Sequence, residues 1–187
     1  QLDNGIHAEI APTDHAALFR FRFPARGDAN LLFDNVDARG GLKLDAATQT
    51  LSGYTDVRSG LSTGATRMYV YASFDRPWHS SGLLDTGRPT GWIKFDAGSA
   101  RQVQMRIATS LMSVDQAKHN AELEIAADAS FEQVAARAQE AWDALLGRFE
   151  VPDATADQAT TLYSNLYRLY LYPNSAHENV GTATAPD

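Results

Sequence analysis

The chain has 187 residues, with 16 basic and 23 acidic side chains and a formal net charge of −7 at pH 7. Its hydrophobic content of 44% and charged content of 21% predict a globular protein and exclude wholesale disorder. The absence of cysteine excludes a disulfide scaffold, thiol catalysis and thiolate metal sites.

The charge balance also bears on partners. An acidic chain without a block of Lys or Arg is not expected to bind nucleic acid, because phosphate neutralisation needs clustered positive charge. No run approaches the ~18 apolar residues that a membrane-spanning helix needs. The sequence starts with neither Met nor an apolar signal segment, so we expect a processed or excised piece.

The first two thirds of the chain have the pattern of β-structure. Residues 16–23 alternate with a period of two, which places three phenylalanines on one face and two arginines on the other. Further β-rich runs are 30–34, 49–54, 66–74, 91–95 and 102–112. Turn signals lie at 39–41, 59–60, 81–82, 87–89 and 97–99. Many short strands without intervening helices predict an antiparallel β-sandwich.

The last third changes to a helical period. Three segments open with a capping-box pattern: Ser113 with Gln116, Ser130 with Gln133, and Thr155 with Gln158. The second predicted helix, 131–146, has one apolar stripe and stops at Gly147. The third, about 156–172, ends before Pro173 and is apolar nearly all round its second half. Such a helix needs neighbours on several sides, so we expect it to open a helical domain that this chain does not complete.

Familiar catalytic and metal-binding motifs are weak here. Residues 60–64 match G-x-S-x-G with Ser62 as the nucleophile, but a strand pattern follows where that motif requires a helix. A hairpin loop rich in Gly and Ser is therefore favoured over a serine esterase. The five histidines are far apart, and no pair has the spacing of metal ligands.

Four carboxylates are candidates for a glycosidase acid/base pair: Asp14, Asp56, Asp75 and Glu178. The sequence does not pair them, and capping of turns or solvation is the alternative for each.

Two further sets of side chains are open to two interpretations. Trp78 and Trp92 are candidate platforms for stacking a sugar, although an aromatic residue in a sandwich is more often part of the core. Glu122 and Glu124 are typical of the solvated side of a helix.

The order of five segments resembles glycoside hydrolase family 92, the bacterial exo-acting α-mannosidases. The segments are 8–24, 68–78, 103–117, Trp142 together with 146–151, and 163–174. They cover almost the whole chain, and their order carries the resemblance more than any single motif does.

This resemblance implies two domains: an amino-terminal β-sandwich of the galactose-mutarotase-like supersandwich type, packed on an (α/α)6 barrel. We expect the sandwich at 1–112, incomplete at its start, a helical connector at 113–151, and the first helix and loop of the catalytic domain at 152–187. The implied full-length enzyme is a calcium-dependent, inverting exo-α-mannosidase. It would hydrolyse linkages such as α-1,2 in mannans or N-glycans, in a secreted or periplasmic location.

The resemblance places no catalytic carboxylate and no calcium ligand in this chain, because no residue here matches those motifs. Asn174 and Glu178 are the substrate-binding candidates, at the rim of the implied site. The implied partners are an α-mannoside glycan and the remainder of the (α/α)6 domain. The alternative function is that of a non-catalytic carbohydrate-binding β-sandwich, with Trp78 or Trp92 stacked on the sugar.

Overall fold

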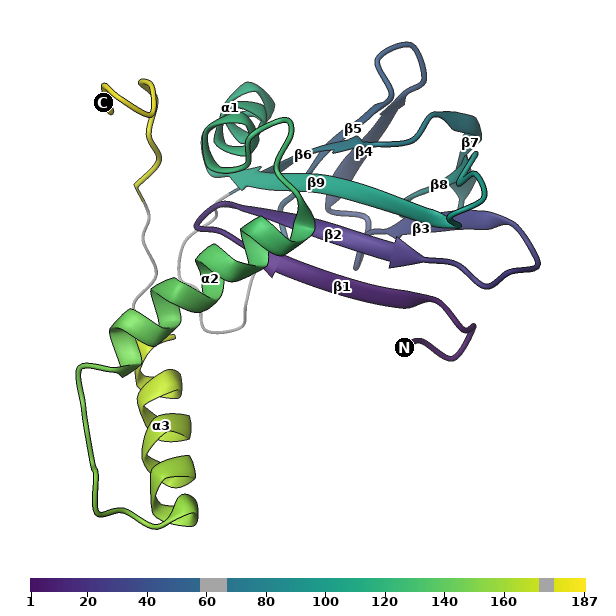
Figure 1. The fold of residues 1–187 in the computed structure, drawn as a ribbon. Helices are drawn as coiled ribbons and strands as arrows, with labels where there is room; N and C mark the ends of the chain where they lie inside the picture. The colour runs from purple at the N-terminus through teal and green to yellow at the C-terminus, as the bar shows by residue number, and fades with distance from the viewer. Residues whose placement is uncertain (58–66, 172–176) are drawn as a thin grey trace.

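The computed structural model describes residues 1–57, 67–171 and 177–187, and within them it contains nine strands and three helices (Figure 1). The strands are β1 (His7–Pro12), β2 (Ala16–Arg22), β3 (Ala29–Asp34), β4 (Gly40–Asp45), β5 (Thr50–Thr55), β6 (Met68–Phe74), β7 (Trp78–Asp85), β8 (Pro89–Phe95) and β9 (Gln102–Ser110). The helices are α1 (Val114–Glu124), α2 (Phe131–Leu146) and α3 (Ala156–Tyr170).

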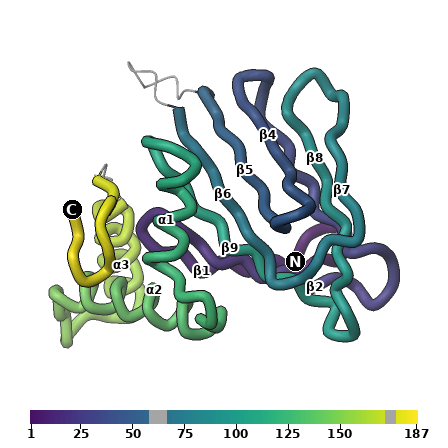
Figure 2. Tube along the Cα trace, turned by 90° about the horizontal axis from the view of Figure 1, so that it is seen from above, coloured from purple at the N-terminus to yellow at the C-terminus, as the bar shows by residue number. Residues whose placement is uncertain are grey.

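The strands form two antiparallel sheets, which confirms the predicted sandwich. The larger sheet has the order β1-β2-β9-β6-β5-β4, and the smaller has the order β3-β8-β7. Every strand pairing is antiparallel. Figure 2 shows the helices on the opposite side of the large sheet from β7 and β8. The chain therefore has three layers, in which helices cover one face of the large sheet and the small sheet covers part of the other.

The core between the sheets begins with the alternating strand β2. The rings of Phe19 and Phe21 stack with centroids 5.7 Å apart on the inner face, as the period of two predicts. Ile93 of β8 and Val103 of β9 are fully buried in this layer, together with Phe95.

A second core lies between the large sheet and the helices. Leu18 of β2 packs there against Ile125, which follows α1, and against Val134 of α2. Arg20, on the same face of β2, places its guanidinium carbon 4.1 Å from the centroid of the Phe131 ring. Its guanidinium also pairs with carboxylates of β1 and α2, which raises the pKa of Arg20 further above its ordinary value. Stacking and ion pairing thus attach α2 to the sheet.

The predicted turn at 81–82 is wrong, and the one at 39–41 is correct only at Arg39, because Gly41 and Gly82 lie inside strands and make room for rings. Gly41 lies within β4, where an added Cβ would lie 2.4 Å from Cε1 of Tyr54. Gly82 lies within β7, where an added Cβ would lie 3.0 Å from Nε1 of Trp92. In both places the strand continues and an aromatic side chain from the neighbouring strand covers the glycine.

The helix caps follow the sequence with one exception. Helix α2 has the predicted bounds and is capped by Gly147, and complete capping boxes start α2 and α3. The predicted box of α1 is only half formed, because Ser113 accepts from the Gln116 amide while the Gln116 side chain points elsewhere. Its Nε2 donates to Asn120 and to the carbonyl of Asn179.

Helix α3 buries none of its residues among those that the structure describes, in agreement with the expected lack of neighbours. Leu169 is 67% exposed. The helix contacts α2 through the rings of Trp142 and Tyr167, whose centroids are 4.7 Å apart, and Tyr163 donates to the Phe149 carbonyl. Helix α3 ends at Tyr170, about two residues before the predicted end. Within the described part of the chain, no helix has the length and apolar character needed to cross a membrane.

Candidate functional site

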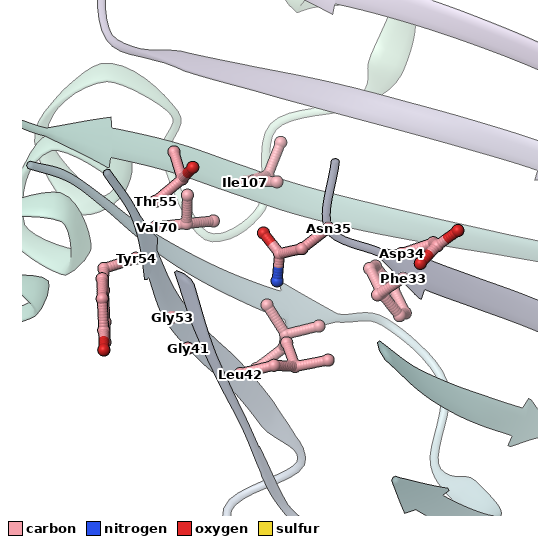
Figure 3. A pocket seen from close by; sticks show the side chains of 11 residues that line it. Phe33, Asp34, Asn35, Gly41, Leu42, Gly53, Tyr54, Thr55, Val70 and Ile107 are labelled. Atoms are coloured by element: carbon pink, nitrogen blue, oxygen red, sulfur yellow. The ribbon is translucent and has the colours of Figure 1, made fainter. Parts of the chain in front are cut away.

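An apolar cavity of about 180 Å³ lies inside the sandwich (Figure 3). It is lined by Phe33, Asp34, Asn35, Gly41, Leu42, Leu51, Gly53, Tyr54, Thr55, Val70 and Ile107. Its one acidic lining residue, Asp34, accepts from both Arg88 and the Thr90 hydroxyl, and these bonds lower the pKa of the Asp34 carboxyl. The described residues that line this cavity therefore supply shape but no second acid for acid–base chemistry.

A second, more polar cavity of about 470 Å³ lies where the sandwich meets the end of the chain. We call it the junction cavity. It is lined by Asp14, His15, Asn120, Leu123, Glu124, His177, Glu178, Asn179, Ala183 and Asp187. These residues come from the β1–β2 turn, from α1 and from residues 177–187, three segments that are distant in sequence.

Glu124 is the hydrogen-bonding centre of one wall of the junction cavity. Its Oε2 accepts from the Thr13 hydroxyl at 2.5 Å, from the His15 amide at 2.8 Å and from the Ala16 amide at 3.0 Å. Its Oε1 accepts from Nδ1 of His15 at 2.7 Å. The side chain is only 19% exposed, so the expectation of a solvated helix face was wrong for Glu124. Its partners lie more than 100 residues away, and no local pattern indicates them.

Glu178 also lines the junction cavity. One carboxylate oxygen accepts from the Leu111 amide at 2.7 Å, and the other accepts from Nδ2 of Asn120 at 2.9 Å. Burial, the largest single influence, raises the pKa of Glu178. Hydrogen bonds from Ser110, Leu111 and Asn120, together with the charge of His15, outweigh burial and lower that pKa overall. Glu178 is therefore held as a carboxylate.

The C-terminal segment is attached to α1 by further bonds. Besides the bond from Gln116 to the Asn179 carbonyl, at 2.8 Å, Nε2 of His119 donates to the Gly181 carbonyl at 2.6 Å. Asn120, which is 2% exposed, connects this segment to the end of β9. Side chains of α1 and the Leu111 amide thus hold residues 178–181 in position.

The four carboxylates considered from the sequence fall in different places. Asp14 and Glu178 line the junction cavity. Asp56, which follows β5, is paired with Arg67, and Asp75, which follows β6, accepts from a backbone amide. Neither residue lines the junction cavity. The structure therefore brings together one pair of the four and adds Glu124, which the sequence did not indicate.

The remaining candidates from the sequence are distributed as follows. Asn174 and the motif around Ser62 lie outside the described residues. Trp78 packs in the core, with its ring edge-to-face against Phe74 at 5.9 Å, and so is not a platform for a sugar. Trp92 lies on the outward face of the small sheet, opposite Leu32 and Gly82 in the strand register.

The described residues do not fit a calcium ion. Among residues 1–57, 67–171 and 177–187, no three His, Cys, Asp or Glu side chains are grouped to hold a metal. The best-placed oxygens, those of Glu124 and Glu178, already accept from N–H and O–H donors. We therefore derive no step through calcium from these residues.

The fold and the cavity together define a class of protein: an antiparallel β-sandwich followed by three helices, with a polar cavity where the sandwich meets α1 and residues 177–187. The model of the glycosyl hydrolase family 92 N-terminal domain matches residues 1–110, and that of the family's catalytic domain matches residues 116–185. The chain belongs to glycosyl hydrolase family 92.

Individual relatives agree with this assignment. An uncharacterized secreted glycosidase of Arthroderma benhamiae is 27% identical over 92% of this chain and 27% of its own length. The inverting family GH92 mannosidase of Bacteroides thetaiotaomicron VPI-5482 superposes with a TM-score of 0.86 at 26% identity, over 94% of this chain and 25% of that one. A GH92 α-mannosidase from Bacteroides thetaiotaomicron shares the fold, with a TM-score of 0.80 at 19% identity, over 93% and 26%. The chain thus spans about a quarter of the length of these relatives.

Proposed function

We propose that this chain supplies the sandwich wall of the substrate pocket in an exo-acting α-mannosidase that hydrolyses α-mannosidic linkages, such as α-1,2, in mannans or N-glycans. The observation that carries the proposal is the composition of the junction cavity. Asp14 and His15 come from the part matched by the family's N-terminal domain, whereas Glu124 and Glu178 come from the part matched by its catalytic domain. A pocket built by both parts makes substrate selection depend on the sandwich.

The proposed chemistry is hydrolysis with inversion of configuration. An acid protonates the leaving oxygen while a carboxylate base activates water on the opposite face of the sugar, with the two carboxyl groups about 6.5–9.5 Å apart. The inverting mannosidase of Bacteroides thetaiotaomicron supports this stereochemistry through its fold and 26% identity. We assign neither the acid nor the base to a residue of this chain and place both in the rest of the catalytic domain.

Calcium belongs to the same proposal. A calcium ion prefers six to eight oxygen ligands and would hold vicinal sugar hydroxyls in the pocket. Since the described residues do not offer such a group, we propose that its ligands, like the catalytic carboxylates, come from elsewhere in the catalytic domain.

The organisation of the full protein follows from the same reasoning. We propose a sandwich at 1–112, a connector at 113–151 and the first part of the catalytic domain at 152–187. The remainder of an (α/α)6 domain would cover the exposed apolar side of α3, where Tyr167 and Leu169 are 44% and 67% exposed. We propose a secreted or periplasmic location in a bacterium, and the relative of Arthroderma benhamiae that is described as secreted supports the extracellular part of this proposal.

The full-length protein tests the activity directly. We expect it to release mannose from α-mannobioses, with β-mannose formed first when the products are followed by proton NMR. The polypeptide 1–187 alone should give no turnover. Release of α-mannose first would overturn inversion, and turnover by the 1–187 polypeptide would overturn the location of the catalytic groups. An intact protein inactive on every α-mannoside would overturn the function.

Asn174 and Glu178 remain our candidates for contact with the substrate at the rim. We expect Glu178→Gln to raise KM for α-mannobiose while kcat stays close to its original value, since the proposed contact is a binding one. Glu122→Gln on the exposed side of α1 is the matched control. A fall in kcat with unchanged KM would contradict a rim position for Glu178.

A further inference from the structure

The outward face of the small sheet has an aromatic residue at its centre. In the register, Trp92 of the middle strand β8 lies opposite Leu32 of β3 on one side and Gly82 of β7 on the other. Leu32 is 61% exposed, and Leu84, two residues after Gly82, is 43% exposed. We call the face formed by Leu32, Leu84 and Trp92 the outer patch.

The indole of Trp92 lies across the sheet. A Cβ added to Gly82 would lie 3.0, 3.2 and 3.3 Å from Nε1, Cε2 and Cζ2 of Trp92, so these ring atoms occupy the space above the glycine. Within the described residues the structure gives the Trp92 Nε1–H no hydrogen-bond partner, and this atom is not among the buried ones. The ring is half-buried and retains a donor that can reach solvent.

Ion pairs lie at both ends of the outer patch. Lys94 lies two residues after Trp92 in β8, and its ammonium group pairs with Asp28 at 2.9 Å. Thr90 lies two residues before Trp92, and its hydroxyl donates to Asp34, which also pairs with Arg88 at 2.6 Å. Each cation is matched by one carboxylate. These two ion pairs therefore add no net charge at the ends of the outer patch, although the chain as a whole carries a charge of −7.

We propose that the outer patch is a carbohydrate-binding surface for a neutral hexopyranose glycan, separate from the junction cavity. The C–H face of a sugar ring would stack on the Trp92 indole, whose polar N–H can bond a hydroxyl. The paired carboxylates and cations of the rim would bond further hydroxyls, about 7 Å to either side of the ring along the strand. A charged ligand would meet no excess of opposite charge on this face.

A second copy of the chain is a poorer occupant. A stable protein interface uses roughly 20–30 residues on each side, around an apolar centre. The outer patch has only three apolar side chains and is bounded by ion pairs along the strand direction. Its size and its neutral polar rim match one or two sugar units better than a protein surface.

Binding of the full-length protein to insoluble α-mannan and to cellulose, measured by depletion, tests the proposal. We expect retention on at least one of these polysaccharides, and about tenfold weaker retention for Trp92→Ala, corresponding to the loss of one aromatic stacking contact. Trp92→Phe should keep part of the retention that Trp92→Ala loses. Leu2→Ser, which removes an exposed leucine outside the outer patch, should bind like the original protein.

A measurement on the unaltered sequence covers the case in which Trp92→Ala does not fold. In protein labelled with 5-fluorotryptophan, the ¹⁹F resonance that Trp92→Phe removes should shift when mannooligosaccharide is added, and the Trp78 resonance should not. Unchanged retention of a folded Trp92→Ala protein, or no shift of the Trp92 resonance, would overturn the proposal. So would a dimer that dissociates in Trp92→Ala.

The proposal of a carbohydrate-binding outer patch and the proposal of mannoside hydrolysis can be overturned independently of each other. Trp92→Ala should hydrolyse a small aryl α-mannoside at the original rate, because Trp92 does not line the junction cavity. If the protein hydrolyses no α-mannoside but still binds a polysaccharide through Trp92, the proposed function fails and the outer patch stands.

Discussion

The sandwich and helix α3 bury apolar surface to very different extents. In the sandwich and its covering helices, Ile93, Val103 and Val134 are fully buried and contact residues distant in sequence. Helix α3 is also rich in Leu and Tyr, but it buries none of its residues, and Leu169 is 67% exposed. One part of the chain is therefore held by its own buried contacts, whereas the other leaves its apolar side chains uncovered among the described residues.

Helix α2 connects these two regions and belongs to both. Its first turn is attached to the sheet through Phe131 and Val134. Figure 1 shows it extending beyond the sheet edge, where its last turns meet α3. Contacts along α2 thus change from a buried core to a smaller contact with α3 that includes the rings of Trp142 and Tyr167.

The largest expected effect is in the core between the sheets. Ile93→Ala should lower the free energy of unfolding by about 2–5 kcal/mol, because it removes apolar contacts and leaves a cavity at a site with no exposure. Leu169→Ala in α3 should change it by less than about 0.5 kcal/mol. Urea denaturation followed by circular dichroism measures both. Equal losses in the two variants would end the distinction between the regions.

A somewhat smaller effect is expected where α1 meets the β1–β2 turn. Glu124→Ala removes the acceptor of the Thr13 hydroxyl and of the His15 and Ala16 amides, and should cost about 2 kcal/mol of stability. Glu122→Ala, on the exposed side of the same helix, should leave the urea midpoint unchanged within error. If both variants are equally stable, the bonds of Glu124 do not hold the turn on α1.

The caps of α2 and α3 give a comparison within one motif. Ser130→Ala should lower the free energy of unfolding by about 1 kcal/mol, since it uncaps a helix packed on the sheet. Thr155→Ala removes the same kind of cap from α3 and should affect only the local helicity of that segment. Hydrogen exchange measured peptide by peptide distinguishes the effects of the two substitutions. Faster exchange throughout the sandwich in Thr155→Ala would show that α3 unfolds together with it.

Local patterns were enough to predict much of the fold. The alternation in residues 16–23 predicts the face on which Phe19 and Phe21 stack, and the caps predict both ends of α2. Gly41 and Gly82 were wrongly predicted to lie in turns, because the rings that require these glycines come from neighbouring strands.

The junction cavity was less accessible to sequence reasoning than the fold. Glu178 was identified through a family resemblance, but its bonds to Leu111 and Asn120 depend on chain segments about 60 residues apart. Glu124 was assigned to solvent, because a helical pattern gives no information on what packs against the end of the helix. Only the folded chain brings these carboxylates to one cavity.

The smallest expected effect is a local response of the junction cavity to pH. The pKa of Glu178 is lowered in the folded protein from its ordinary value of 4.5, so its carboxylate form stabilises the attachment of residues 177–187. That contribution is complete above the ordinary pKa and is lost as the pH falls through the lowered one. We expect residues 177–187 to exchange amide hydrogens faster below pH 4 than at pH 6, after correction for intrinsic rates.

Glu178→Gln separates this titration from general acid unfolding. A neutral amide cannot lose a charge, so its segment 177–187 should be loosened to the same extent at both pH values, while the peptides of β8 and β9 stay protected in both proteins. A pH response that survives in Glu178→Gln would show that the titration does not belong to Glu178. Faster exchange in the β8 and β9 peptides at low pH would instead mean that the whole sandwich is acid-labile. In that case the difference between the junction and the core would be one of degree only.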